Sequence, residues 1–186
     1  MKGIVFPAVL ALAIYILGTI SYAQDKKDLW ADAQTVTLTG ADNKEVGTAK
    51  LLQTPNGVLV QLSLTKAAPG VHAFHVHAVG KCEGPEFTSA GGHFNPTSKK
   101  HGLLSKEGPH TGDLPNVIVP DSGTLTVEVV IPHVTLKEGG QTLADADGSA
   151  LVLHAGADDY TTDPTGNAGG RIACGVIAPP QAAAAK

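Results

Sequence analysis

The feature that most limits how this chain can fold is a set of short stretches in which apolar and polar residues alternate. A period of two predicts β-strands with one buried face, because successive side chains of a strand point to opposite sides. No stretch shows a convincing helical stripe. The predicted strands are rich in β-branched residues and end at turn residues, and they cover residues 36–38, 49–52, 58–64, 74–76, 117–119, 125–129, 151–153 and 172–177.

These stretches predict an all-β fold of about eight antiparallel strands, which close into a sandwich or a barrel. Residues 54–57 read Thr-Pro-Asn-Gly and predict a hairpin turn, since Asn-Gly accepts the positive φ of tight turns. The length of 186 residues favours one domain. With one Trp, three Tyr and four Phe in the chain, the core must consist mostly of Val, Leu, Ile and Ala.

The first 23 residues have the pattern of an export signal. Residues 3–20 carry no charge, and Ser21-Tyr22-Ala23 resembles a signal-peptidase site. An uncleaved membrane anchor is the alternative, but Pro7 interrupts the apolar stretch and favours cleavage. We therefore expect a signal peptide at 1–23 and one mature domain at 24–186. That domain would be periplasmic or secreted, with no stable membrane association.

The charge of the chain argues against nucleic acid as a partner. Thirteen Lys and Arg residues face seventeen Asp and Glu residues, for a net charge of −4. No basic run is long enough to follow a phosphate backbone.

Two cysteines, Cys82 and Cys174, lie far apart in the sequence. In an oxidising compartment such a pair predicts a structural disulfide more readily than a thiol catalyst. Two unrelated buried thiols are the alternative.

Six of the eight histidines gather around one long irregular segment, residues 79–115. Connections of this length are more often functional than idle. His75 and His77 alternate within a predicted strand and therefore face the same side. Buried imidazoles and carboxylates are costly unless satisfied, so we expect metal ligation by copper or zinc. The other candidate ligands are His93, His101, His110, Asp113 and His154.

This donor set can be divided between two metals. Three histidines and one aspartate complete a closed tetrahedral zinc site, whereas four histidines suit the tetragonal field of Cu(II). Together the two sites need seven imidazoles where the cluster offers six. One histidine would then serve both metals through its two ring nitrogens.

Four segments of the chain resemble copper/zinc superoxide dismutase, in the order of that family. The segment Gly-Lys-Cys-Glu-Gly-Pro at 80–85 is similar to its exported bacterial members. The resemblance implies a Greek-key antiparallel β-sandwich or barrel with long metal-binding and channel loops. It also implies disproportionation of superoxide by a His-bound copper that is alternately reduced and oxidised, beside a structural zinc. The four segments are residues 70–77, 89–96, 110–114 and 166–177.

The resemblance assigns roles to individual residues. His93 would bridge the two metals and Arg171 would attract and position the anion, so both count as catalytic. Asp158 would orient ligands of both metals, Thr165 would narrow the channel, and the two cysteines would form the family's disulfide. The implied copper ligands are His75, His77, His93 and His154, and the implied zinc ligands are His93, His101, His110 and Asp113.

Some features are not explained by the metal sites. Ala73 stands where the family usually has Gly, which suggests a backbone conformation that Ala can also adopt. We expect His72 to be a structural histidine and His133 to be exposed. Family members form dimers through different faces and some are monomers, so a homodimer is only modestly favoured. The rival interpretations are a non-catalytic copper- and zinc-binding domain on the same fold and an exported adhesion-type sandwich with incidental histidines.

Overall fold

The computed structural model describes residues 28–181, so the predicted signal peptide at 1–23 lies outside the described residues. Within this part the chain forms nine strands and one short 3-10 helix, and no helix long and apolar enough to cross a membrane. The elements are β1 Gln34–Gly40, β2 Glu45–Thr54, β3 Gly57–Leu64, β4 Gly70–His72, β5 Phe74–His77, η1 Thr88–Ala90, β6 Val117–Val119, β7 Leu125–Pro132, β8 Ser149–His154 and β9 Arg171–Ala178.

Eight of these strands contain the predicted stretches, and the all-β prediction is confirmed. The additional strand is β4, which has three residues and includes a glycine. So short a segment carries no alternation to detect. It becomes a strand by pairing with β6, far along the chain, with Val71 opposite Ile118.

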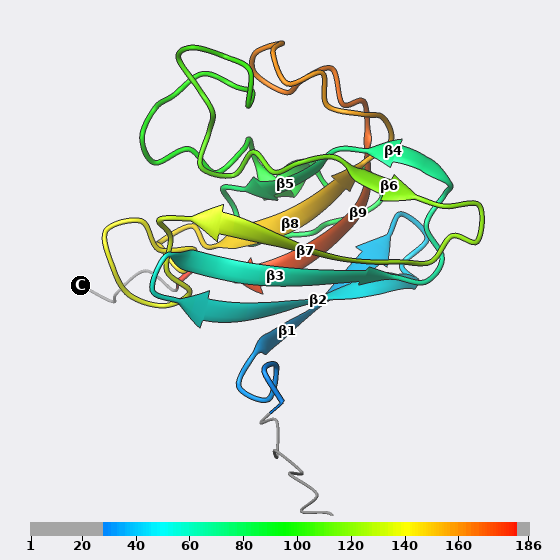
Figure 1. Ribbon diagram of the computed structural model, residues 1–186, viewed down its shortest axis with the longest axis horizontal. Coiled ribbons are helices and arrows are strands. Elements are labelled where there is room, and N and C mark those ends of the chain that lie inside the picture. The colour runs from blue at the N-terminus through cyan, green and yellow to red at the C-terminus, as the bar shows by residue number, and fades with distance from the viewer. Residues whose placement is uncertain (1–27, 182–186) are drawn as a thin grey trace, which may run out of the picture.

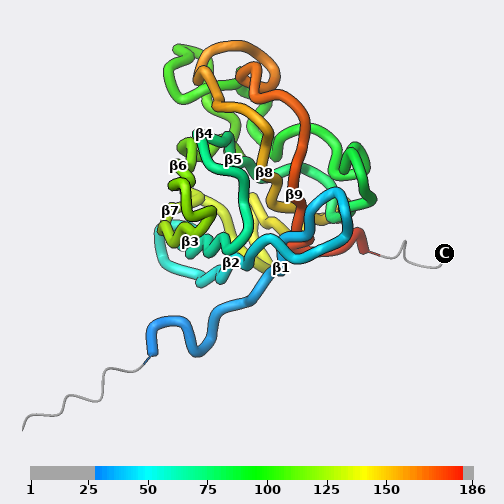
Figure 2. Tube along the Cα trace, turned by 90° about the vertical axis from the view of Figure 1, so that its right-hand side faces the viewer, coloured from blue at the N-terminus to red at the C-terminus, as the bar shows by residue number. Residues whose placement is uncertain are grey.

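The strands form a curled antiparallel sheet in the order β5-β8-β9-β1-β2-β3-β7, with β4 and β6 as a separate pair. β9 lies beside β1, which is followed by β2 and β3, and this is the Greek-key order. Figure 2 looks along the strands and shows β4 and β6 between β7 and β5, so that the strands surround a common interior. The sheet therefore closes nearly into a barrel.

The interior is filled by the inward residues of the alternating strands. On β3, Val58, Val60, Leu62 and Leu64 are fully buried, while the residues between them are partly exposed. The main core contains mostly Val and Leu side chains, as the scarcity of aromatic residues predicted. Burial of this apolar surface is the main favourable contribution to folding.

A second, smaller core lies on the outside of β8 and β9. There Phe87 and Ala90 of the long segment after β5 pack on Val152 and Cys174. As a result, β8 is buried on both faces. The predicted disulfide between Cys82 and Cys174 is present in this second core, with its Cα atoms 5.6 Å apart. It ties the long segment to β9, and Figure 1 shows that segment, in green, next to the orange segment between β8 and β9.

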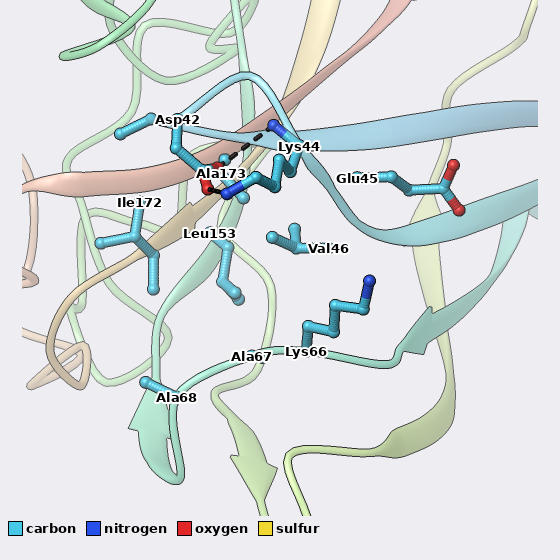
Figure 3. Close-up of a pocket in the computed structure, with 12 residues that line it drawn as sticks. Asp42, Lys44, Glu45, Val46, Lys66, Ala67, Ala68, Leu153, Ile172 and Ala173 are labelled. Atoms are coloured by element: carbon cyan, nitrogen blue, oxygen red, sulfur yellow. Dashed lines mark hydrogen bonds and ion pairs between the residues drawn. The ribbon is translucent and has the colours of Figure 1, made fainter.

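One end of the barrel opens into a cavity of about 530 Å³, shown in Figure 3. The β1–β2 turn and the connection from β3 to β4 form its rim, where Lys44 pairs with Asp42 at 2.8 Å. Leu153 and Ile172 line the apolar part. None of the predicted metal ligands lines this cavity, so the candidate site must be sought elsewhere.

Removing the disulfide by a double Cys82→Ala, Cys174→Ala substitution should lower the free energy of unfolding by about 2–5 kcal/mol, because the unfolded chain regains the freedom of a long loop. The measurement is urea unfolding of the metal-free proteins without reductant. Wild type treated with a thiol reductant should lose the same amount. Equal stability of oxidised wild type and the variant would contradict this role.

Candidate metal centre

Strand β5 carries the first two histidines on the outer face of the barrel. Phe74 and Val76 point into the main core, whereas His75 and His77 are at most 1% exposed on the other side. Neighbouring strand β8 ends at His154, whose amide donates to the carbonyl of Ala73 at 2.9 Å. The alternation expected from the sequence therefore brings three imidazoles together at one corner of the sheet.

The long segment after β5 returns twice to the free edge of that strand. The amide of Phe94 donates to the carbonyl of Val76 at 2.8 Å, and the amide of Val76 donates to the carbonyl of Gly112 at 2.9 Å. These bonds place the next residues in register, so that His93 lies opposite His77 and Asp113 opposite His75. Backbone pairing therefore positions the side chains of His93 and Asp113.

The four predicted copper ligands form one group. One ring nitrogen of each histidine lies within 4.8 Å of the others, and the Nε2 atoms of His77 and His154 are 3.3 Å apart. Carbonyl oxygens hold the opposite nitrogens of these two rings. His77 Nδ1 lies 2.9 Å from the carbonyl oxygen of Gly91, and His154 Nδ1 lies 3.3 Å from that of Gly169. Both rings are thereby oriented with Nε2 toward the centre of the group.

The predicted zinc ligands form a second group around Asp113. Its Oδ1 atom lies 2.9 Å from His93 Nδ1, 3.1 Å from His101 Nδ1 and 3.2 Å from His110 Nδ1. Its Oδ2 atom accepts hydrogen bonds from the amides of Gly102 and His110, each at 2.9 Å. One carboxylate thus faces three imidazoles and at the same time fixes the loop that carries two of them.

The ring of His93 belongs to both groups, because Nδ1 faces Asp113 and Nε2 faces the other set. Within the described residues three buried ring nitrogens make no hydrogen bond, namely His75 Nδ1, His93 Nε2 and His101 Nδ1, although Asp113 Oδ1 lies 3.1 Å from the last of these. Buried polar atoms without a partner are costly, and all three point into the two groups. The residues present therefore fit a pair of metal ions that share one imidazole.

Asp158 contacts one imidazole of each ligand group, on the ring nitrogen that faces away from the group. Its Oδ2 lies 2.8 Å from His75 Nε2, and its Oδ1 lies 2.9 Å from His101 Nε2. Hydrogen bonds of this kind fix the tautomer and the direction of a ligating ring. These two contacts are compatible with the role that the family resemblance implied for Asp158, and that role stays a prediction.

Asn116 and Tyr160 hold Asp158 in place, and the sequence analysis missed both. The Asn116 side chain accepts from the amide of Asp158 at 2.8 Å and donates to its carbonyl at 2.9 Å. The hydroxyl of Tyr160 accepts from the amide of Asn116 at 2.8 Å. Neither residue stands in a recognisable motif, so only the three-dimensional structure reveals them.

The backbone of Gly166 packs directly against the Asp158 carboxylate. A side chain at this position would run into the Asp158 carboxylate, and the backbone has a φ of +64°, which favours glycine. The carboxylate can therefore approach His101 closely only because residue 166 lacks a Cβ atom.

Arg171 opens β9 directly opposite His154. Its guanidinium donates to the carbonyls of Phe87 and Gly91, both at 2.6 Å, so Gly91 accepts from Arg171 and from His77 alike. Burial lowers the pKa of Arg171, but a guanidinium keeps its charge at neutral pH. A fixed positive charge therefore lies beside the first group.

The remaining histidines and Thr165 lie outside both groups. His72 is buried, with its ring nitrogens 2.8 Å from the carbonyl oxygen of His154 and 2.9 Å from that of Ala68, as expected of a structural histidine. His133 is exposed, as predicted. Thr165 is exposed in a turn closed by its amide to Thr162, and its place opposite Arg171 stays a prediction.

The buried site favours the protonation states that ligands need. Burial lowers the pKa of His93 to about 4, although its bond to Asp113 opposes this, and burial lowers the pKa of His154 to about 3. Burial would raise the pKa of Asp113, but the bonds from His110 and His93 and from the Gly102 amide outweigh it and hold that pKa well below its usual range. At neutral pH the metal-free site therefore contains His93 and His154 as neutral imidazoles and Asp113 as a charged carboxylate.

The lowered histidine pKa values predict that the metal-free protein loses stability as the pH falls from about 6.5 to about 4. Over this range the unfolded chain binds protons that buried His93 and His154 do not, so acid favours unfolding. Urea unfolding at several pH values checks the slope, and a His154→Gln variant should show a smaller one. Titration of His93 near its ordinary pKa, followed by NMR, would contradict the prediction.

Comparison with known proteins supports the same interpretation. Residues 45–177 match the family model of copper/zinc superoxide dismutase. The chain is 49% identical over 164 residues to superoxide dismutase [Cu-Zn] 1 of Aquifex aeolicus. The alignment covers 87% of this chain and 94% of that protein. It is 43% identical to superoxide dismutase [Cu-Zn] of Caulobacter vibrioides, over 77% of this chain and 84% of the relative.

Solved structures share the fold. A SOD-like protein from Bacillus subtilis aligns with a TM-score of 0.74 at 39% identity, covering 77% of this chain and 97% of that one. The Cu/Zn superoxide dismutase from Brucella abortus aligns with a TM-score of 0.62 at 33% identity, covering 78% of this chain and 99% of that one. The matched residues include both histidine groups, and the chain therefore belongs to the copper/zinc superoxide dismutase family.

Proposed function

We propose that this protein disproportionates superoxide, turning two superoxide anions and two protons into O2 and hydrogen peroxide. The observation that carries the proposal is the ring of His93, which faces both ligand groups with one nitrogen each. Family membership supports the same activity.

The donor sets distinguish the two metals. We assign copper to the group of four imidazoles, because a set without a carboxylate suits Cu(II). We assign zinc to the group of three imidazoles and Asp113, which is closed and therefore structural. When bound, copper supplies the redox chemistry, since it can accept an electron from one superoxide and return an electron to the next. The copper ligands are His75, His77, His93 and His154, and the zinc ligands are His93, His101, His110 and Asp113.

In this proposal Arg171 attracts and positions the anion. The chain has a net charge of −4, so an anionic substrate needs a local positive charge at the site. Two carbonyls fix the guanidinium, which has further N–H groups that can face a bound anion. Thr165, in the segment between β8 and β9, would narrow the approach opposite Arg171.

His93 Nε2 is the atom at which this chain can hold a proton between the two halves of the reaction. The nitrogen is buried and has no hydrogen-bond partner within the described residues. In the metal-free site burial lowers the pKa of this ring, and the same burial favours the release of a proton held there. His93 Nδ1 lies 2.9 Å from Asp113 Oδ1, and both atoms would bind zinc, so the ring would keep its place while Nε2 takes up and gives back the proton.

The cellular location and the assembly are predictions from the sequence. We propose that residues 1–23 are removed as a signal peptide and that residues 24–186 act as one domain in the periplasm or outside the cell. The disulfide between Cys82 and Cys174 supports an oxidising location. A homodimer stays a prediction.

A non-catalytic copper- and zinc-binding domain is the second candidate. One relative, YojM of Bacillus subtilis, is named superoxide dismutase-like and is 40% identical over 145 residues. Membership of the family therefore does not by itself decide between the two candidates. The complete group of four imidazoles next to Arg171 favours catalysis, since a metal buffer has no need of an anchored anion site.

Metal content and activity measured on the same sample test the function. The purified protein should contain one copper and one zinc and should consume superoxide. Chelation should abolish this activity, and addition of both metals should restore it. An Arg171→Ala variant should keep both metals, because every ligand remains, and should lose most of the activity, because the charge that attracts the anion is removed. A fully loaded wild type without activity would support the non-catalytic alternative instead.

The bridge assignment predicts the behaviour of His93→Ala. This variant should keep some copper and some zinc, because three ligands of each group remain, but the Cu(II) spectrum should lose the signature of the shared imidazole. Electron paramagnetic resonance of the copper-loaded protein checks this. His72→Gln serves as the matched control, because that ring belongs to neither group. An unaltered Cu(II) spectrum in His93→Ala would refute the bridge.

A further inference from the structure

Several backbone amides of the loop that carries the predicted zinc ligands donate their hydrogen bonds to carboxylate side chains. They do not pair with the backbone of a neighbouring strand. The amides of Gly102 and His110 donate to Asp113 Oδ2. The amide of His101 donates to Oδ1 of Asp163 at 2.8 Å. Asp163 belongs to a different segment, the connection between β8 and β9, so this bond joins two segments that are far apart in the sequence.

His101 is therefore held at two points by carboxylates of one short segment. Asp158 Oδ1 holds its ring through Nε2 at 2.9 Å, and Asp163 Oδ1 holds its backbone amide. Two fixed points on one residue determine both the position of the Cα atom and the direction of the ring. Because of this, His101 Nδ1 faces Asp113 Oδ1 at 3.1 Å.

Asp163 also lies near the other histidine of the loop. The same Oδ1 atom is 4.0 Å from His110 Nε2, on the side of that ring that faces away from the group. The Oδ2 atom pairs with Lys100 at 3.2 Å, but both side chains are substantially exposed, at 58% for Lys100 and 39% for Asp163. Exposed ion pairs contribute little, so the bond to the His101 amide is the contact that matters.

We propose that Asp163 is a positioning residue for the zinc ligands His101 and His110 and that it slows the release of zinc. The proposal rests on the zinc assignment made above. Asp163 touches neither metal nor substrate, and it acts by fixing the backbone from which His101 projects. Groups that orient metal ligands typically change metal affinity by about 10–100-fold when removed.

The test compares zinc release from copper- and zinc-loaded full-length variants, followed with a chromophoric chelator. Asp163→Ala should release zinc about tenfold faster than wild type. Asp163→Asn keeps an oxygen for the His101 amide and should lie close to wild type. Lys100→Met removes only the exposed ion pair and should also behave as wild type.

Asp159→Ala is the matched control for a general loosening of the segment. Asp159 accepts only from Thr161, Thr162 and Asn167 of its own segment, and none of these is a predicted ligand. This variant should release zinc at a rate close to that of wild type. If Asp163→Ala is no faster than Asp159→Ala, or if Asp163→Asn is as fast as Asp163→Ala, the positioning role is overturned.

A spectroscopic measurement separates positioning from unfolding. With Co(II) in place of zinc and copper in its own group, Asp163→Ala should shift the visible absorption of Co(II), because His101 changes its direction, while Asp163→Asn should restore the wild-type spectrum. An unchanged Asp163→Ala spectrum would contradict the proposal. A wild type that holds no zinc would overturn the zinc assignment as well, whereas wild-type zinc content with unchanged release would overturn only the role of Asp163.

Discussion

The alternation of β5 is the constraint on which the rest of the structure depends. Phe74 and Val76 enter the main core, and this obliges His75 and His77 to face outward. A shift of one residue would exchange the two faces, burying imidazoles in the barrel and exposing Phe74. The packing of the core therefore determines where the metal ligands lie. The two returns of the long segment to the edge of β5 then complete both groups around that fixed pair.

Carboxylates organise the site at two levels. Asp113 faces three imidazoles with one oxygen and receives two amides with the other, while Asp158 orients one ring of each group. Each of these negative charges is buried, which is tolerated because hydrogen bonds surround it. The same burial lowers the pKa of His93 and keeps that ring neutral, and within the described residues three ring nitrogens of the site make no hydrogen bond. The donor atoms of the two groups therefore fit a pair of cations.

Features with a local pattern could be predicted from the sequence, and features that depend on contacts across the chain could not. The alternating stretches predicted eight strands because each carries its own period, whereas β4 has three residues and is defined by its partner β6. The histidines stand out by number and spacing. Asn116, Tyr160 and Asp163 are ordinary polar residues in loops, and their importance comes only from the groups they meet. Such contacts between separate segments leave no signal in a single sequence.

The carbonyl of Gly91 accepts from both His77 and Arg171 and lies in the segment that the disulfide ties to β9. One backbone atom is therefore the common anchor of a metal-binding ring and of the charge that would receive the anion. A displacement of this carbonyl therefore disturbs a hydrogen bond of the His77 ring and a hydrogen bond of the Arg171 guanidinium at the same time. The orientation of a metal-binding ring and the position of the anion-binding charge thus depend on one peptide group, which joins the two parts of the site without a hydrogen bond between their two side chains in the described part of the chain.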